Sequence, residues 1–168
     1  MTRISVIVPT ALVLLLAAPA MAQTPVLGGH VGATTGMEAG DPGSGQTTFR
    51  RARTRVMVGV DGRVDEDLKN GLGLVVFAEI EPHATLGGEL RYMRWFSPNV
   101  IGFVGATGVF APRTLLGADF GLQFHLPMAA GVTVFFEPSF AALPLGTDLP
   151  SDRVLVWGLL SGGIHAKF

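Results

Sequence analysis

The most constraining feature of this chain is a strict alternation of apolar and polar residues over residues 117–126, GADFGLQFHL. The polar positions include Asp119, Gln123 and His125, and the positions between are filled by Ala118, Phe120, Leu122, Phe124 and Leu126. On a helix, with about 3.6 residues per turn, His125 would fall among the apolar side chains. A strand has a period of two and separates the sets completely. The segment is therefore predicted to be a strand whose two faces meet different surroundings.

The first 22 residues have the pattern of a cleavable signal peptide. One cation, Arg3, precedes an apolar run over residues 4–18, and residues 20–22 are the small-residue triplet AMA that signal peptidase accepts. We predict a signal peptide at 1–22 and a single barrel domain at 23–168. The alternative is a retained membrane anchor, but the run is shorter than the ~20 apolar residues of a spanning helix.

The composition removes several classes of function. The chain has no cysteine, which excludes disulfides, thiolate metal sites, a thiol nucleophile and lipoprotein acylation. A net charge of -1 lacks the basic character of a nucleic-acid-binding protein. Charged residues form only 15% of the chain, against roughly 25% in soluble domains. An exported chain this apolar, with no second hydrophobic helix, must hide its apolar surface in another way.

Eight segments of the mature chain read as strands. They lie at residues 26–35, 49–61, 72–81, 85–96, 100–111, 117–126, 131–143 and 153–168, and the inward phase of 100–111 is left open. Most have the ten or so residues that a tilted strand needs to cross a bilayer. Because lipid offers no partners to free backbone groups, only helices and closed barrels span membranes. We predict an all-β fold, an eight-stranded antiparallel up-and-down transmembrane β-barrel with both termini at one end.

Two barrels of opposite polarity fit this alternation. In a soluble periplasmic lipocalin-like barrel the apolar face lines a cavity for a hydrophobic ligand, whereas in an outer-membrane barrel it faces lipid. The polar face is rich in glycine and poor in charge, which suits a crowded interior better than a solvated surface. The outer-membrane arrangement is therefore preferred. It predicts these lipid-facing residues: Val56, Val58, Leu74, Val76, Leu90, Phe120, Leu122, Phe136 and Ile164.

Charged residues of the polar faces are predicted to form an ion network inside the barrel. If the second and third strands pair about a turn at 62–70, Arg53 falls opposite Glu79 and Arg51 opposite Glu81. Enclosed charges need partners, because an unpaired one costs several kcal/mol. The alternative is a solvated charged face, where such pairs contribute only ~0 to 1 kcal/mol. The predicted network consists of Arg51, Arg53, Arg55, Glu79, Glu81, Glu89, Arg91, Asp119 and Glu137.

The sixth and seventh strands bring two carboxylates together. Pairing about a turn at 127–129 places Asp119 opposite Glu137. Two facing carboxylates repel each other, so either an arginine of the second strand reaches them or one of them is protonated. A catalytic acid and base would look the same, but no other residue completes a mechanism.

These features resemble the small eight-stranded outer-membrane barrels of bacteria, of the OmpA transmembrane-domain and OmpX kind. The resemblance covers residues 26–168 and includes the C-terminal segment SGGIHAKF. It implies an assembly signal at Ser161, Gly163 and Phe168, although Ala166 stands where a larger apolar residue is usual. It also implies a Gram-negative cell envelope, with outer-membrane lipid, lipopolysaccharide and the assembly machinery as partners, and a monomer.

Barrels of this size also include lipid A-modifying enzymes, whose deacylases carry a His-x-Ser motif. His30, His83, His125 and His165 are followed two positions later by Gly32, Thr85, Pro127 and Lys167, so the motif is absent. The histidines show no metal-ligand spacing and are interpreted as members of the inner network. No metal, cofactor or catalytic residue is predicted.

Aromatic residues near one end of the predicted strands suggest an interfacial girdle. Its expected members are Tyr92, Trp95, Phe96, Phe124 and Phe168. The function predicted from these observations is a non-enzymatic outer-membrane protein with a closed lumen, structural or making surface contacts through residues 37–48 and 143–152. A lipocalin-like ligand carrier and a lipid A-modifying enzyme are the second and third hypotheses.

Overall fold

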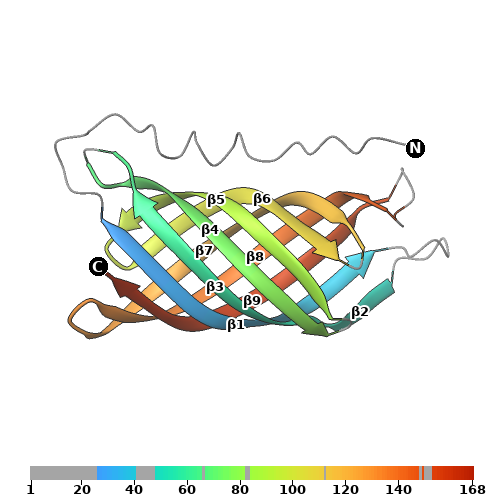
Figure 1. Cartoon of the computed structure of the whole chain (residues 1–168), viewed down its shortest axis with the longest axis horizontal. Helices are drawn as coiled ribbons and strands as arrows, with labels where there is room; N and C mark the ends of the chain where they lie inside the picture. The colour runs from blue at the N-terminus through green and yellow to red at the C-terminus, as the bar shows by residue number, and fades with distance from the viewer. Residues whose placement is uncertain are drawn as a thin grey trace, which may run out of the picture.

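The computed structural model of the chain is a closed β-barrel with strongly tilted strands (Figure 1). It describes residues 26–40, 48–65, 67–81, 84–111, 113–147, 149 and 153–168, and for 48–52 the backbone alone. The predicted signal peptide lies outside these residues. The strands are β1 (Leu27–Gly40), β2 (Thr48–Ala52), β3 (Thr54–Arg63), β4 (Asn70–Glu81), β5 (Thr85–Ser97), β6 (Val100–Ala111), β7 (Leu115–Ala129), β8 (Val132–Gly146) and β9 (Leu155–Lys167).

The barrel closes where β1 pairs with β9, from Gly28 opposite Lys167 to Ala39 opposite Val156. On its other side β1 pairs first with β3 and then with β2. These two are one barrel strand interrupted at Arg53, whose backbone N–H donates to the carbonyl of Gly36 at 2.7 Å. The predicted eight-stranded antiparallel barrel is therefore confirmed. Closure leaves the eight barrel strands without a free edge inside the wall.

The two ends of the barrel differ. At one end β1 begins and β9 finishes, and the backbone N–H of Phe168 donates to the carbonyl of Leu27 at 3.1 Å (Figure 1). The connections 64–69, 98–99 and 130–131 share this end, which we call the terminal end. The strand ends that flank residues 41–47, 82–84, 112–114 and 147–154 share the opposite end, which we call the loop end.

The outer surface of the barrel is apolar. Its side chains alternate with buried ones along each strand, as the pleat requires. The burial pattern also shows which face of β6, the predicted strand 100–111, points inward. Ile101 and Phe103 point into the lumen, while Val104 and Phe110 point outward. All nine residues predicted to face lipid are exposed on the outside: Val56, Val58, Leu74, Val76, Leu90, Phe120, Leu122, Phe136 and Ile164.

The strand registers differ from those expected. Arg55, and not Arg53, lies opposite Glu79, because β3 and β4 pair about a turn centred one residue further along. Asp119 lies opposite Ala141 and not opposite Glu137. Here β7 and β8 run on to a two-residue turn at 130–131, which Gly131 permits with a φ of 74°. The residue opposite Glu79 moves by two positions and the residue opposite Asp119 by four, and even shifts do not exchange the inward and outward sets of these strands.

The expected aromatic girdle needs one correction. Tyr92 and Phe96 are exposed near the terminal end, but Trp95 between them points inward and is buried. Strand parity decides this, since neighbouring residues on a strand face opposite sides. Trp95 packs inside with Met93, Ile101 and Phe103.

Candidate functional site in the barrel lumen

The inner face of the barrel carries nearly all of the buried charge of the described residues. Every second residue points inward, and glycine at some of these positions leaves room for long side chains. A Cβ at Gly105, for example, would lie 2.8 Å from Oδ1 of Asp119. The lumen is therefore filled by large polar side chains that rest on a partly bare backbone.

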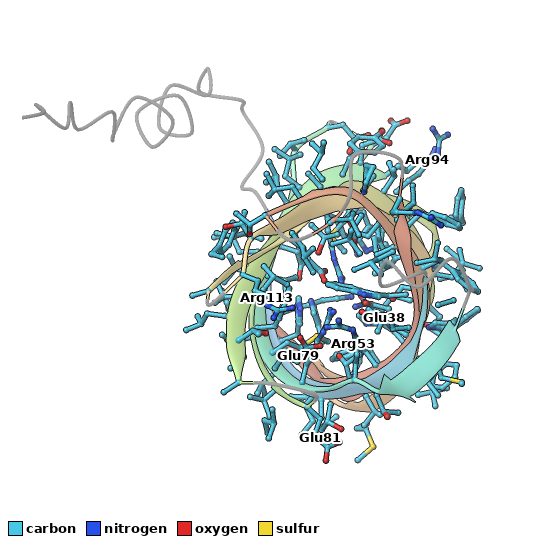
Figure 2. The ribbon with its side chains drawn as sticks, turned by 90° about the vertical axis from the view of Figure 1, so that its right-hand side faces the viewer. Glu38, Arg53, Glu79, Glu81, Arg94 and Arg113 are labelled. Carbon is cyan, nitrogen blue, oxygen red and sulfur yellow. The ribbon has the colours of Figure 1, made fainter. Side chains whose placement is uncertain are left out.

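At the loop end the network is built on Arg53 and Glu79. Nη1 of Arg53 donates to both carboxylate oxygens of Glu79, at 2.6 Å each, and its other guanidinium nitrogens donate to Glu38. Arg55 reaches Glu79 at 3.4 Å and Glu89 at 3.8 Å. Figure 2, a view into the loop end, shows Glu38, Arg53 and Glu79 converging inside the ring of strands. Paired in this way, the buried charges are compensated.

Trp157 of β9 supports both arginines from one side. The guanidinium carbons of Arg53 and Arg55 lie 4.1 and 4.4 Å from its ring centroid, and its Nε1 donates to Glu38 at 2.9 Å. Arg55 also lies 4.3 Å from the ring centroid of Phe77. With 0% of its surface exposed, Trp157 closes this level of the lumen. Cation–π contacts of this kind strengthen when they are shielded from water.

At mid-height the network converges on Arg91 of β5. Its guanidinium donates to Glu137 through two bonds of 2.9 Å and to Glu89 at 2.9 and 2.5 Å. Asp119 lies 3.8 Å from its Nε. Asp119 and Glu137, which were predicted to lie opposite each other, are not cross-strand neighbours, but both lie near Arg91, an arginine of β5 and not of the second predicted strand.

A chain of hydrogen-bonded polar groups leads from Glu137 toward the terminal end. Nε2 of Gln123 donates to Glu137 at 2.8 Å, and its Oε1 lies 2.6 Å from Nε2 of His125. The other ring nitrogen of His125 lies 2.9 Å from the hydroxyl of Thr133. Beyond it, Nε2 of His165 is 2.8 Å from Asp61, and His30 is 3.9 Å from the same carboxylate oxygen.

Apolar side chains fill the rest of the lumen. One buried cluster surrounds Phe77, Phe135, Leu143 and Trp157, and a second at the terminal end contains Trp95 and Phe103. An eight-stranded barrel has an interior just wide enough to be filled in this way. The lumen is therefore a packed core and not an open channel.

Seven of the nine predicted network residues are buried in the lumen, and the other two are Glu81 and Arg51. Glu81 is exposed at the rim, where β4 ends and the hydroxyl of Thr54 donates to it at 3.1 Å, and Figure 2 shows it outside the ring. The prediction for Glu81 is wrong, because the alternation stops where the strand leaves the wall. The side chain of Arg51 lies outside the described residues.

Several partners of the network were not predicted from the sequence. Glu38 lies beyond the predicted end of the first strand, although it has the parity of His30 and Thr34. Asp61 shares the parity of Arg53 and Arg55 and could have been assigned by the same rule. Trp157 carried no recognisable signal, because its role depends on which side chains reach it across the lumen.

The predicted assembly residues lie on the closing strand. Ser161 is buried, with its hydroxyl 2.9 Å from that of Thr34. Gly163 pairs with Gly32 across the seam, and Phe168 is exposed at the terminal end. Among the residues that the structure describes, no group of three or more His, Cys, Asp or Glu could hold a metal ion.

Outside the membrane-spanning strands, one carboxylate has a distinctive environment. Asp65, in the turn after β3, accepts hydrogen bonds from the backbone N–H of Asn70 at 2.9 Å and from its side-chain amide at 2.5 Å. The backbone hydrogen bond from Asn70 lowers the pKa of Asp65, since it stabilises the charged form. The turn is thus clamped by an ionised aspartate.

Comparison with solved structures finds small bacterial outer-membrane barrels. AlkL, determined in lipid bilayers, matches with a TM-score of 0.53 and 11% identity over 90% of this chain and 94% of AlkL. Ail, the attachment invasion locus protein of Yersinia pestis, matches with 0.50 and 13% over 84% and 99%. OprG from Pseudomonas aeruginosa matches with 0.50 and 10% over 86% and 96%. The sequence matches no family model and no curated protein. At these identities the likeness shows the fold.

Proposed function

We propose that this protein is a non-enzymatic integral barrel of the bacterial outer membrane with a closed lumen, structural or making surface contacts at its loop end. Its fold is that of small outer-membrane barrels, and its exposed belt of valine, leucine and phenylalanine suits acyl chains. The observation that carries the proposal is the buried network centred on Arg91, which occupies the space that a conducting pore would need.

The network argues against the two other hypotheses. A lipocalin-like carrier needs an apolar cavity, whereas here the arginines and carboxylates point inward and Phe120, 60% exposed, points outward. An enzyme needs access to its nucleophile. Among the described residues, the Thr133 hydroxyl lies beside His125, and both are buried in the lumen, away from lipid substrates. No cofactor is included in the proposal.

The proposed partners follow from the exterior. Outer-membrane lipid and lipopolysaccharide would contact the apolar belt and the outer rim of the loop end at Glu81. The terminal segment with Ser161, Gly163 and Phe168 would be read by the assembly machinery. We propose a monomer that binds no nucleic acid.

The proposed location and closed lumen can be tested together. The folded protein should stay in the membrane fraction after a carbonate wash, show heat-modifiable migration, and give no ion conductance in planar bilayers at neutral pH. Leu122→Asp should block membrane assembly because a charge would face lipid, while Leu122→Ala at the same site should assemble. Release into the aqueous fraction, steady conductance, or equal assembly of both variants would contradict the proposal.

The non-enzymatic part needs a separate measurement. Mass spectrometry of lipid A from cells with and without the protein should give the same profile. A lost or added acyl chain would favour the enzyme hypothesis instead.

A further inference from the structure

Three histidines from different strands meet inside the barrel near its terminal end. The ring centroids of His125 and His165 are 5.0 Å apart, and the rings of His30 and His165 stack with 6.3 Å between centroids. All three side chains are buried. Because imidazole can take up a proton, three ionisable groups share one enclosed space.

The wall is shaped to hold these rings. A Cβ at Gly28 would lie 2.5 Å from Nε2 of His165, and a Cβ at Gly59 would overlap the ring of His30. Phe135 packs beside both His30 and His125, with ring centroids 5.6 and 6.4 Å away. The rings therefore fill the space that these glycines leave inside the wall.

A single carboxylate compensates the group. Oδ2 of Asp61 lies 2.8 Å from Nε2 of His165 and 3.9 Å from Nδ1 of His30. Within the described chain, neither nitrogen of His30 has a hydrogen-bond partner, nor has Nδ1 of His165. One imidazolium would be balanced by Asp61, but a second and a third would face each other.

The other elements packed around the group add little negative charge. β9 adds Lys167 near His125, and β3 adds Arg63, which lies 4.7 Å from the ring centroid of Trp95. Glu137 of β8 is already bonded to Arg91 and reaches His125 only through Gln123. The neighbouring inward side chains of β4, β5 and β6 are apolar: Val75, Met93, Trp95, Ile101 and Phe103.

We propose that the terminal half of the lumen is a proton-sensitive closure, in which protonation of His30 and His165 around the single carboxylate of Asp61, with the ring of His125 against that of His165, drives the rings apart and admits water from the terminal end. The loop half stays closed as the pH falls, because the guanidinium groups of Arg53 and Arg55 keep their charge. The proposal requires only the folded barrel and is independent of the envelope role proposed above.

The two tryptophans of the chain report on the two halves separately. Trp95 lies in the lumen at the terminal end and Trp157 at the loop end, and both are buried. In detergent-folded Trp157→Phe, quenching of Trp95 by acrylamide should rise about twofold or more from about pH 7.5 to 5 and reverse on return. In Trp95→Phe, quenching of Trp157 should stay constant. An unchanged Trp95, or an equal rise at both, would overturn the proposal.

Histidine variants test the cause of the response. In the Trp157→Phe background, His125→Gln/His165→Gln keeps hydrogen-bonding groups that do not titrate, and should abolish the acid response of Trp95. His83→Gln, which removes the fourth histidine of the chain, is the matched control and should retain it. If the double variant does not fold, as judged by the absence of heat-modifiable migration, His30→Phe is the second test. It preserves an aromatic ring and should weaken the acid response of Trp95. A full response in the folded double variant or in His30→Phe would refute the role of the histidines.

Discussion

The two halves of the lumen are closed by different chemistry. At the loop end, Arg53 and Arg55 are held by Glu38, Glu79 and Glu89, and Trp157 lies against both guanidinium groups. At the terminal end, three histidines share the carboxylate of Asp61 and leave ring nitrogens unpaired within the described chain. Permanent charges must be matched when they are buried, whereas imidazole can be buried uncharged. The first half is thus a fixed closure and the second an adjustable one.

Arg91 joins the two halves, so its loss should have the largest effect. Arg91→Gln would leave Glu89, Asp119 and Glu137 together without their common cation. We expect the free energy of unfolding, from urea titration in detergent, to fall by about 3 to 5 kcal/mol. Arg94→Gln, an exposed position on the same strand, should change it by no more than about 0.5 kcal/mol. Equal losses would show that Arg91 is not the junction.

In the loop half, Glu79→Gln should cost about 2 to 3 kcal/mol, because hydrogen bonds to two charged guanidinium groups are weakened. The same loss should be measured at about pH 7.5 and 5.5, since the arginines stay charged at both. Glu81→Gln, at the exposed end of the same strand, is the control and should be nearly neutral. A loss that vanished in acid would erase the distinction between the halves.

In the terminal half, Asp61→Asn should cost less at neutral pH, about 1 kcal/mol, because Asp61 makes one close hydrogen bond, to His165, whereas Glu79 holds two guanidinium groups. The loss should grow in acid, where the carboxylate is the counter-charge of the protonated histidines. Urea titration at both pH values measures this difference. If Asp61→Asn lowered the free energy of unfolding equally at both pH values, as is expected of Glu79→Gln, the two carboxylates would have the same role.

The smallest effect is expected at the turn after β3, outside both halves. The pKa of Asp65 is lowered in the folded protein, chiefly by the N–H of Asn70, so its stabilising contribution is present above the unfolded pKa. That contribution is lost as the pH falls through the folded pKa. Asp65→Asn should therefore lower stability slightly at neutral pH and not at strongly acidic pH. A loss that persists in acid would point to a cause other than the ionised carboxylate.

The sequence predicted which way side chains point better than it predicted what they meet. The alternation assigned Phe120 and Leu122 to the outside and Arg53 and Glu79 to the inside, and the structure agrees. It misplaced Glu81, because parity loses its meaning at a strand end. The pairing of Asp119 with Glu137 was inferred from a turn placed too early, and a turn position depends on how far both strands extend.

The candidate site depended on contacts that no local pattern contains. Arg91 lies on β5, four strands from β9 around the wall. It nevertheless bonds Glu137 of β8, the neighbour of β9, across the lumen. The meeting of His30, His125 and His165 likewise requires β1, β7 and β9 to be brought to one level by strand tilt and by closure of the barrel.

The amino-acid sequence by itself determined the all-β class, the number of barrel strands and the polarity of their two faces. It could do so because the strand period is local and because every strand repeats the same inside and outside. Only the tertiary structure decided which charges pair and which histidines share a carboxylate. Those contacts are set by register and by closure of the wall, two quantities that belong to the whole barrel.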